Sequence, residues 1–541
     1  MTPRLPVDLQ RQIMWNRLIA IVEEQAQTLL RTAFSPIVRE AGDLSAGVFD
    51  CQGRMLAQAV TGTPGHVNSM AESVKHFIRH FGLERMKAGD AYITNDPWMG
   101  TGHLNDFVIT TPCFIEGRLV GLFSCTSHLI DIGGIGFGPD ATDVFMEGLY
   151  IPMLKLIDEG QVNQTLLEMI RANTRLPVDT VGDTYALLAC NEVGCQRLVE
   201  MMTEFELHDL DELGTHICDR SEQAVLDEIA KLPKGSWSNT MLTDGYDSPI
   251  ALTATLTISE GSVHVDYAGS DPMVGRGINV PMAYTTAYTV FGLSCIVAPR
   301  IPKNAGSLKP LTVSAPEGCI LNAPKPAAVC SRHVIGQMLP DVVFGCLHQV
   351  IPDRVPAEGT SCIWNLNVRG RTKSGTSGNY GFSMTFTSNG GTGARQLSDG
   401  LSATAYPSGV KGTPVEIAEQ ITPLLFWRKE FRPDSGGLGR TRGGLGQIIE
   451  FESRIGEPFE LLAAYDRIDH PARGRDGGRD GATGSVSLRS GKVFKGKGFL
   501  YVPAGDRLVV QTPGGGGLGD LAERDPAAIA RDTEAGLVNT G

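Results

Sequence analysis

The chain lacks several patterns that would assign it to familiar classes of protein. Its 11 cysteines include no Cys-x-x-Cys pair, so neither a zinc ribbon nor a disulfide framework is predicted, and the thiols are expected to be reduced and buried. No window of about 18 uninterrupted apolar residues occurs, so no membrane span is expected. The first fifteen residues carry prolines and charges without an apolar signal core, which favours a cytoplasmic protein.

Charge and missing nucleotide motifs exclude further classes. The chain has 47 basic and 60 acidic residues and a formal net charge of −13, whereas a nucleic-acid groove needs a basic face. A Gly-x-x-x-x-Gly-Lys-[Ser/Thr] phosphate loop is absent, and no serine-nucleophile elbow with a placed histidine and acid is visible. If the chemistry of this chain requires ATP, another chain must therefore supply the nucleotide site.

Glycine is abundant, with 65 residues in 541, against a usual share of about 7%. The glycines form short runs, including residues 435–446 and 514–519. The second run is predicted to be a tight turn, or a backbone cradle around a partner or substrate. A dinucleotide fingerprint is rejected because no Rossmann unit surrounds it.

Hydrophobic periodicity predicts an α+β fold with several domains. We expect an N-terminal helical and β-hairpin metal domain over residues 1–232, a mixed α/β middle domain over 233–425 and a glycine-rich β domain over 426–541. Within the first, helices are predicted over 7–33, 68–81 and most of 160–231. Two apolar runs, 107–114 and 119–127, are split by Glu116-Gly117-Arg118 and predict an antiparallel hairpin.

Two histidine–aspartate pairs flank this hairpin. His103 and Asp106 lie three residues apart at its start, and His128 and Asp131 lie three apart at its end. Because the open ends of an antiparallel hairpin meet, these side chains are expected to converge. Imidazole and carboxylate ligands without cysteine are typical of a catalytic zinc, iron or manganese site with open coordination positions. The alternative is a satisfied polar network at the mouth of the hairpin.

Two other residues are weaker candidates. Asp43 precedes a predicted strand and is either a further carboxylate for the metal or part of a surface turn. His66 lies in a glycine-containing loop before a predicted helix, where it is either a substrate contact or a plain helix-entry residue.

The chain resembles the hydantoinase B and oxoprolinase family along essentially its whole length. The segments that carry the resemblance include Asn95-Asp-Pro-Trp-Met-Gly-Thr-Gly-His-Leu-Asn-Asp, Ser127-His-Leu-Ile-Asp-Ile-Gly-Gly and Thr512-Pro-Gly-Gly-Gly-Gly-Leu-Gly-Asp. The family includes ATP-dependent hydantoinases and N-methylhydantoinases, lactamases, 5-oxoprolinase, and acetone and acetophenone carboxylases. The resemblance implies metal ligands at His103, Asp106 and His128, with Asp43 as a further carboxylate.

The resemblance also implies a partner and a reaction. A hydantoinase A-type subunit would bind ATP and Mg²⁺ and phosphorylate the substrate oxygen, within a heterotetramer or larger complex. This chain would hold a divalent metal (Zn, Fe or Mn) that activates water to open a hydantoin, lactam or 5-oxoproline ring. Asp131 or Asp43 is the expected general base, and His66 is a second catalytic candidate.

Two alternatives remain open. The first is a subunit of an ATP-dependent ketone carboxylase, although the carboxylase subunits of the family tend to be larger than this chain. The second is a non-catalytic scaffold for the ATP-using subunit.

Overall fold

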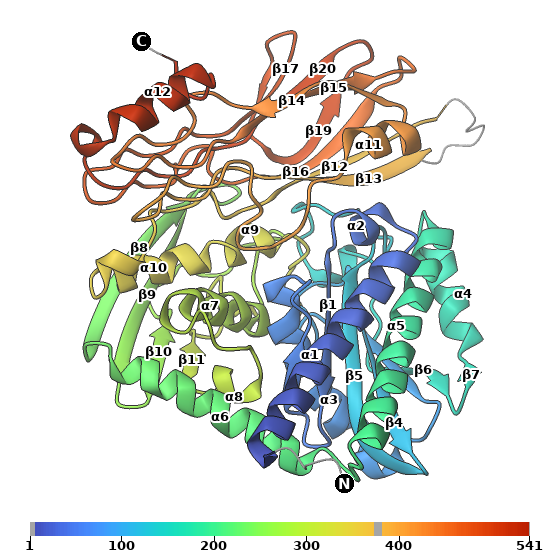
Figure 1. The fold of residues 1–541 in the computed structure, drawn as a ribbon. Helices are drawn as coiled ribbons and strands as arrows, with labels where there is room; N and C mark the ends of the chain where they lie inside the picture. The colour runs from blue at the N-terminus through green and yellow to red at the C-terminus, as the bar shows by residue number, and fades with distance from the viewer. Residues whose placement is uncertain (1–5, 373–380, 540–541) are drawn as a thin grey trace.

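The structure is a computed structural model that describes residues 6–372 and 381–539. It contains helices and four β-sheets arranged as several stacked parts (Figure 1), which confirms the predicted mixed, multidomain α+β fold. Among the helices of these two ranges, none is both long enough and apolar enough to cross a membrane.

The N-terminal part is a seven-stranded sheet with the order β2-β1-β5-β4-β3-β6-β7. Its central hairpin is β4 and β5, as the two apolar runs predicted. The strands are β1 (Leu44–Phe49), β2 (Met55–Gln58), β3 (Ala91–Thr94), β4 (Asp106–Ile115), β5 (Arg118–His128), β6 (Leu154–Asp158) and β7 (Gln161–Val162). The helices around it are α1 (Val7–Thr32), α2 (Pro36–Arg39), α3 (Pro64–Phe81), α4 (Gln164–Asn173), α5 (Pro177–Glu204) and α6 (Asp211–Ala230).

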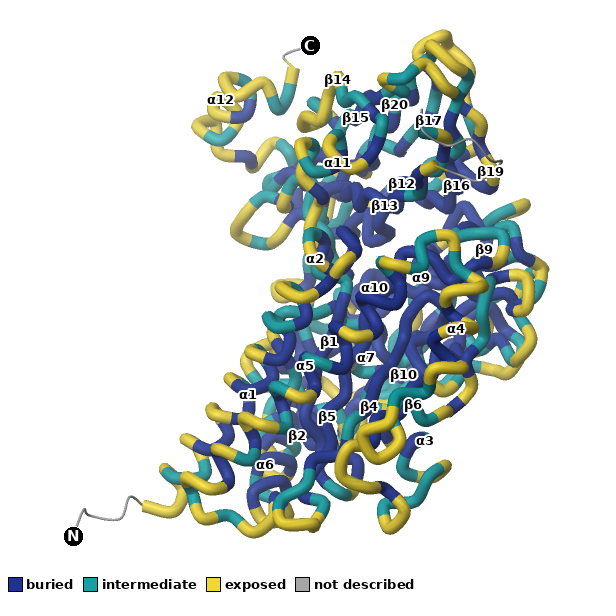
Figure 2. The backbone as a smooth tube through the Cα atoms, turned by 90° about the vertical axis from the view of Figure 1, so that its right-hand side faces the viewer, coloured by how far each residue is buried: buried dark blue, intermediate teal, exposed yellow. Residues whose placement is uncertain are grey.

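Helices cover both faces of this sheet. On one face, Phe123 and Cys125 of β5 pack among residues of α1 and α5. On the other face, Val108 and Leu122 pack against α3. Strands buried on both faces read as continuous apolar runs, and Figure 2 shows them in dark blue inside helices with exposed outer surfaces. The hairpin that ends in the histidine–aspartate pairs is therefore held on both sides.

The predicted helix over 68–81 starts earlier than expected. It begins at Pro64, because proline at the first helical position has a pre-set φ and needs no N–H partner. His66 therefore lies in the first turn of α3 rather than in a loop.

The middle of the chain forms a four-stranded sheet of order β11-β10-β9-β8. Buried and half-buried residues alternate along β9, so the sheet has one core face and one wetter face. Helices α7 and α10 contribute to the same core. The strands are β8 (Gly235–Thr243), β9 (Ile250–Ser259), β10 (Ser262–Asp266) and β11 (Leu311–Ser314); the helices are α7 (Met282–Val297), α8 (Ala305–Leu308), α9 (His333–Gly336) and α10 (Leu339–His348).

The C-terminal part contains two further sheets, of orders β13-β12-β16-β19 and β14-β15-β20-β17-β18. Aromatic rings join them: Phe451 of one sheet and Phe459 of the other have centroids 5.6 Å apart. The elements are β12 (Trp364–Gly370), β13 (Phe382–Ser388), α11 (Val415–Ile421), β14 (Leu424–Phe431), β15 (Gln447–Ser453), β16 (Phe459–Ala464), β17 (Ser485–Leu488), β18 (Val493–Phe494), β19 (Lys497–Val502), β20 (Arg507–Gln511) and α12 (Pro526–Glu534). One sheet thus joins strands from both sides of residue 425, while the three-domain division itself stays a prediction.

The glycine run at 514–519 is neither a tight turn nor a cradle. Residues 514–518 are buried and hydrogen-bond through their backbone to several other segments. Gly515 N–H donates to Gly444, and Gly516 N–H donates to Glu358. Backbone packs directly on backbone here, so a Cβ atom on Gly515 would lie 2.0 Å from the carbonyl oxygen of Thr392. The glycines are needed for close approach.

We expect Gly515→Ala to destabilise the protein by about 3 kcal/mol or more, because rigid backbone has no room for the added methyl group. Gly275→Ala is the matched control, since a Cβ there meets nothing within 4 Å. Thermal unfolding of the two variants checks this. Equal melting temperatures would show that the glycine segments can move apart without loss of stability.

Candidate metal centre

The open end of the β4–β5 hairpin gathers three buried side chains. Asp106, the first residue of β4, pairs in register with His128, the last residue of β5. His103 lies in the loop that enters β4. One ligand atom from each of these residues lies within 4.8 Å of the others, and each residue is at most 3% exposed. The predicted convergence at the hairpin mouth is thus present for three of the four residues of the two histidine–aspartate pairs, and Asp131 is the exception.

The protonation of His103 indicates what this cluster can hold. Its Nδ1 lies 2.9 Å from the carbonyl oxygen of Cys330, and because a carbonyl only accepts, Nδ1 carries the proton. Burial, then the Arg332 cation, lowers the pKa of His103 to about 4, so the ring is neutral near pH 7. Its Nε2 then presents a lone pair to Oδ1 of Asp106, 2.7 Å away.

Within the described ranges, Nε2 of His103 and Oδ1 of Asp106 have no hydrogen-bond partner. The same holds for Nε2 of His128. Two acceptors that face each other at such a distance are unfavourable unless a cation lies between them. Nitrogen and oxygen donors without a thiolate suit zinc, iron or manganese, and three protein ligands leave coordination positions free. The residues therefore fit a divalent metal.

The other oxygen of Asp106 is fully engaged. Oδ2 accepts hydrogen bonds from Thr101 at 2.6 Å and from Arg332 at 2.7 Å, and it lies 3.0 Å from Nε2 of His66. Burial alone would raise the pKa of Asp106, but His66 and the Arg332 cation hold it well below its usual range. Asp106 is therefore an ionised carboxylate with one oxygen held by the protein and one available.

A segment more than two hundred residues away supplies the support for this centre. Cys330 offers its carbonyl to His103, and Arg332 pairs with Asp106 while lying 4.0 Å above the ring of Tyr284. The buried Glu147 anchors this segment, because its Oε1 accepts the backbone N–H groups of Val329 at 2.6 Å and Cys330 at 2.7 Å. Hydrogen bonds of this kind set the tautomer and the direction of a ligand histidine.

Asp43 and His66 lie at the same cavity. Oδ1 of Asp43 accepts a hydrogen bond from Thr63 at 3.0 Å and lies 3.5 Å from Nδ1 of His66. His66 thus lies between Asp43 and Asp106. Burial lowers the pKa of His66, but the two carboxylates outweigh burial and raise it overall. The structure places both predicted residues beside the cluster, with Asp43 outside the tight group of three.

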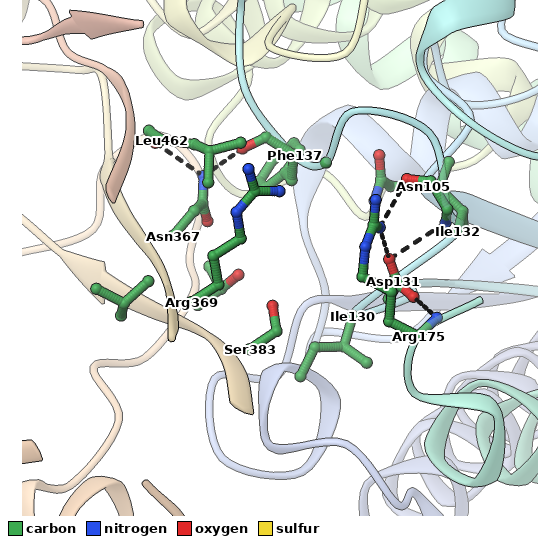
Figure 3. Close-up of a pocket in the computed structure, with 14 residues that line it drawn as sticks. Asn105, Ile130, Asp131, Ile132, Phe137, Arg175, Asn367, Arg369, Ser383 and Leu462 are labelled. Carbon is green, nitrogen blue, oxygen red and sulfur yellow. Dashed lines mark hydrogen bonds and ion pairs between the residues drawn. The ribbon is translucent and has the colours of Figure 1, made fainter. Parts of the chain in front are cut away.

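Asp131 is not brought to the cluster. Its carboxylate pairs with Arg175, 2.7 Å from Nη1, and it also accepts the backbone N–H groups of Arg175 and Gly133. Figure 3 shows Asp131 facing Arg175 in a neighbouring cavity, with Arg369 on the opposite wall. The chain turns after His128, so the carboxylate of Asp131, three residues later, lies beside Arg175 and not beside the cluster.

The cavity beside the cluster has a volume of about 20 Å³, and its walls come from all parts of the chain. Phe137 separates it from the neighbouring cavity, since its ring lies against those of His128 and His333, with centroids 4.7 and 5.7 Å away. The lining residues are Asp43, Thr63, His66, His103, His128, Phe137, Tyr284, Arg332, His333, Gln337, Ile363, Asn365, Ser408 and Val410.

Several residues that line or support this cavity were not predicted from the sequence. Arg332, His333, Asn365 and Ser408 were not singled out, and neither was Glu147. The run Cys330-Ser-Arg-His does bring three chemically active residue types together, which was a usable signal. The others stand among ordinary loop and strand residues, without a local pattern that marks them.

Comparisons with known proteins give a consistent result. The family model for Hydantoinase B/oxoprolinase matches residues 8–521. Uncharacterized protein MJ0963 of Methanocaldococcus jannaschii is 31% identical over 524 residues, covering 95% of this chain and 91% of its own. Caprolactamase subunit beta of Pseudomonas jessenii is 27% identical over 540 residues, covering 95% and 91%. 5-Oxoprolinase 1 of Arabidopsis thaliana is 28% identical over 545 residues, covering 94% of this chain but 42% of its own.

Two solved structures share the fold. The ATP-dependent caprolactamase from Pseudomonas jessenii superposes with a TM-score of 0.90 at 26% identity, covering 99% of this chain and 95% of that one. Nucleotide-free acetone carboxylase gives a TM-score of 0.88 at 18% identity, covering 99% and 79%. At 18% identity the second match supports the fold alone.

We expect His128→Ala to lower metal affinity by more than about a hundredfold, because it removes a ligand and not only a supporting group. The purified chain should then fall from about one bound ion to nearly none, as measured by elemental analysis. His208→Ala, which changes an exposed histidine, should keep the ion. Equal metal content in both variants would remove His128 from the centre.

The stability of the folded chain should depend on pH through Glu147. Burial raises its pKa from 4.5 to about 8, so between these values the folded chain keeps a proton that the unfolded chain has lost. The contribution of Glu147 to the free energy of unfolding is therefore fully present below pH 4.5. It declines as pH rises toward 8, by a few kcal/mol at most.

The variant Glu147→Gln should remove this decline while keeping an oxygen acceptor for Val329 and Cys330. Denaturant unfolding at pH 5.5 and 8.5 measures the effect. The wild type should lose stability relative to the variant at the higher pH; a difference that does not change with pH would contradict the assignment.

Proposed function

The chain belongs to the hydantoinase B/oxoprolinase family, and we propose that it is the metal-binding subunit of an ATP-dependent cyclic amidohydrolase. The observation that carries this proposal is the pair of unpartnered acceptors, Nε2 of His103 and Oδ1 of Asp106, 2.7 Å apart in a buried cavity. The likeness to ATP-dependent caprolactamase, at 26% identity and a TM-score of 0.90, favours amide-ring opening as the reaction.

Each residue has a distinct part in this proposal. His103, Asp106 and His128 hold the divalent ion, with Asp43 as a further carboxylate. Such an ion, when bound, lowers the pKa of water and polarises a carbonyl oxygen. Arg332 and Thr101 hold Oδ2 of Asp106, so that the other oxygen stays directed at the ion.

His66 is the proposed proton donor. It lies between Asp43 and Asp106, which raise its pKa, so it can hold a proton that the ring nitrogen needs when the carbon–nitrogen bond breaks. Asp131 remains a candidate general base from the sequence, but its ion pair with Arg175 favours a supporting role. We therefore assign the donation of a proton to the ring nitrogen to His66, and we assign no proton transfer to Asp131.

The ATP-using step is assigned to a separate hydantoinase A-type subunit that binds Mg²⁺ and ATP. An amide carbonyl is a poor electrophile, and phosphorylation of its oxygen would make the carbonyl carbon easier for water to attack; the ring nitrogen then leaves as the amine. The chain has no phosphate-loop motif, and it matches only 42% of the length of 5-oxoprolinase 1, so the larger protein has room for a second activity. A heterotetramer or larger complex is the expected assembly.

The purified complex with its ATP-using partner should open hydantoin or lactam rings only when ATP and the divalent metal are both present. The assay is a panel of these rings, with product measured by mass spectrometry. A ketone with bicarbonate is the comparison substrate, since acetone carboxylase shares the fold. Carboxylation without ring opening would reject the hydrolase assignment in favour of a carboxylase.

The same complex with His128→Ala tests the scaffold alternative. Assembly should persist while metal content and turnover are lost. Full activity in this variant would show that the subunit only supports its partner.

A further inference from the structure

The metal cavity is closed in this structure. Its volume of about 20 Å³ has room for about one water molecule, whereas pockets that take a small organic ligand usually enclose about 300 Å³ or more. A ring therefore cannot reach His103, Asp106 and His128 unless a lining group moves away. The contacts of the lining residues indicate which group can do so.

Exposure narrows the choice to two residues. Of the fourteen residues that line the cavity, all of which lie in the described ranges, only Asp43 and Phe137 are half-buried, and the others are buried. Asp43 is fixed, because its side chain accepts a hydrogen bond from Thr63 at 3.0 Å and its backbone carbonyl accepts the N–H group of His128 at 3.1 Å. Phe137 is therefore the lining residue that lies near solvent without a polar anchor on its side chain.

The ring of Phe137 packs against the imidazoles of the centre. Its centroid lies 5.7 Å from that of His103, 4.7 Å from that of His128 and 5.7 Å from that of His333. Contacts between rings are individually weak, whereas hydrogen bonds and an ion pair hold the wall around Asp106. The ring can therefore leave its place without breaking a polar interaction.

The backbone beneath this ring is held in place. Nδ2 of Asn367 donates a hydrogen bond to the carbonyl oxygen of Phe137 at 2.8 Å (Figure 3). The next residue, Gly138, packs so closely on the C-terminal sheet that a Cβ atom there would lie 3.0 Å from Cβ of Leu462. Movement of Phe137 is therefore expected as rotation of its side chain between staggered rotamers, and not as displacement of the loop.

We propose that Phe137 is the gate of the metal cavity: its ring closes the cavity in this structure and rotates outward to admit a ligand. The closed cavity keeps bulk water away and has room for about one water molecule, and hydrolysis of one amide bond consumes one water. The inference rests on the proposed function only for the identity of the ligand that enters.

Chemical modification of histidine measures this gate. Diethyl pyrocarbonate attacks unprotonated imidazole nitrogens and is much larger than water. Nε2 of His128 and Nε2 of His333 have no hydrogen-bond partner in the described chain, so both rings should react once the reagent can enter. Peptide mass spectrometry of the purified, metal-free chain gives the rate at each residue.

Variants of Phe137 should change these rates according to the size of the side chain. Phe137→Ala should raise the rates at His128 and His333 by at least about tenfold, because entry no longer waits for a local opening. Phe137→Leu should give an intermediate rate and decides the question if the alanine variant does not fold. Phe137→Tyr keeps the ring and should match the wild type. Unchanged rates in the folded alanine or leucine variant would reject the gate.

Two controls separate access from general loosening of the fold. Phe431→Ala changes an exposed phenylalanine of β14 that lines neither cavity, and it should leave both rates unchanged. His264, whose ring nitrogens lie 2.8 Å from Thr312 and 3.0 Å from Ser314, should react equally in every variant. A parallel rise at His264 in Phe137→Ala would show a loosened fold and overturn the gate.

The wild type tests the rotation itself. Slow modification of His128 and His333, while the circular dichroism spectrum stays native, would show that the ring opens and closes. No modification after the same long exposure would show a fixed wall and overturn the inference. Because the reagent needs no metal, ATP or partner, a failed ring-opening assay would reject the proposed function and leave this result unaffected.

Discussion

The buried carboxylate of Asp106 is the group on which the rest of the centre depends. A charge removed from water is costly unless it is paired and hydrogen-bonded, and Asp106 is fully buried. Thr101 and Arg332 stabilise one oxygen, and His66 lies beside it. The other oxygen faces His103 and His128. The asymmetry leaves one oxygen available to a metal and commits the other to the protein.

Rigid surroundings keep the two oxygens of Asp106 in these different positions. The hairpin that carries Asp106 and His128 is covered on both faces by helices, so its open end keeps a fixed register. The segment anchored by Glu147 then sets the proton of His103 on Nδ1 through the Cys330 carbonyl. A histidine whose tautomer is fixed by an outer hydrogen bond is a better metal ligand, and here the outer hydrogen bond comes from a distant part of the chain.

Different parts of the chain supply different walls of the cavity. The proposed metal ligands come from the N-terminal sheet and its loops, whereas other lining residues come from α9, β12 and the loop that contains Ser408. The glycine segments around Gly515 let the C-terminal part pack backbone against backbone.

Local sequence patterns were sufficient for the mixed fold, the hairpin and the meeting of His103, Asp106 and His128, because strand alternation and hairpin pairing act between neighbours in the chain. They also led to Asp43 and His66, which line the same cavity. Patterns were insufficient where contacts join distant segments. The Cys330 carbonyl meets His103 across 227 residues, and no local period marks such a contact. The pairing of Asp131 with Arg175, the anchoring role of Glu147 and the position of His333, Asn365 and Ser408 at the cavity were decided only by tertiary packing, since burial and the distance to a counter-charge exist only once the chain is folded.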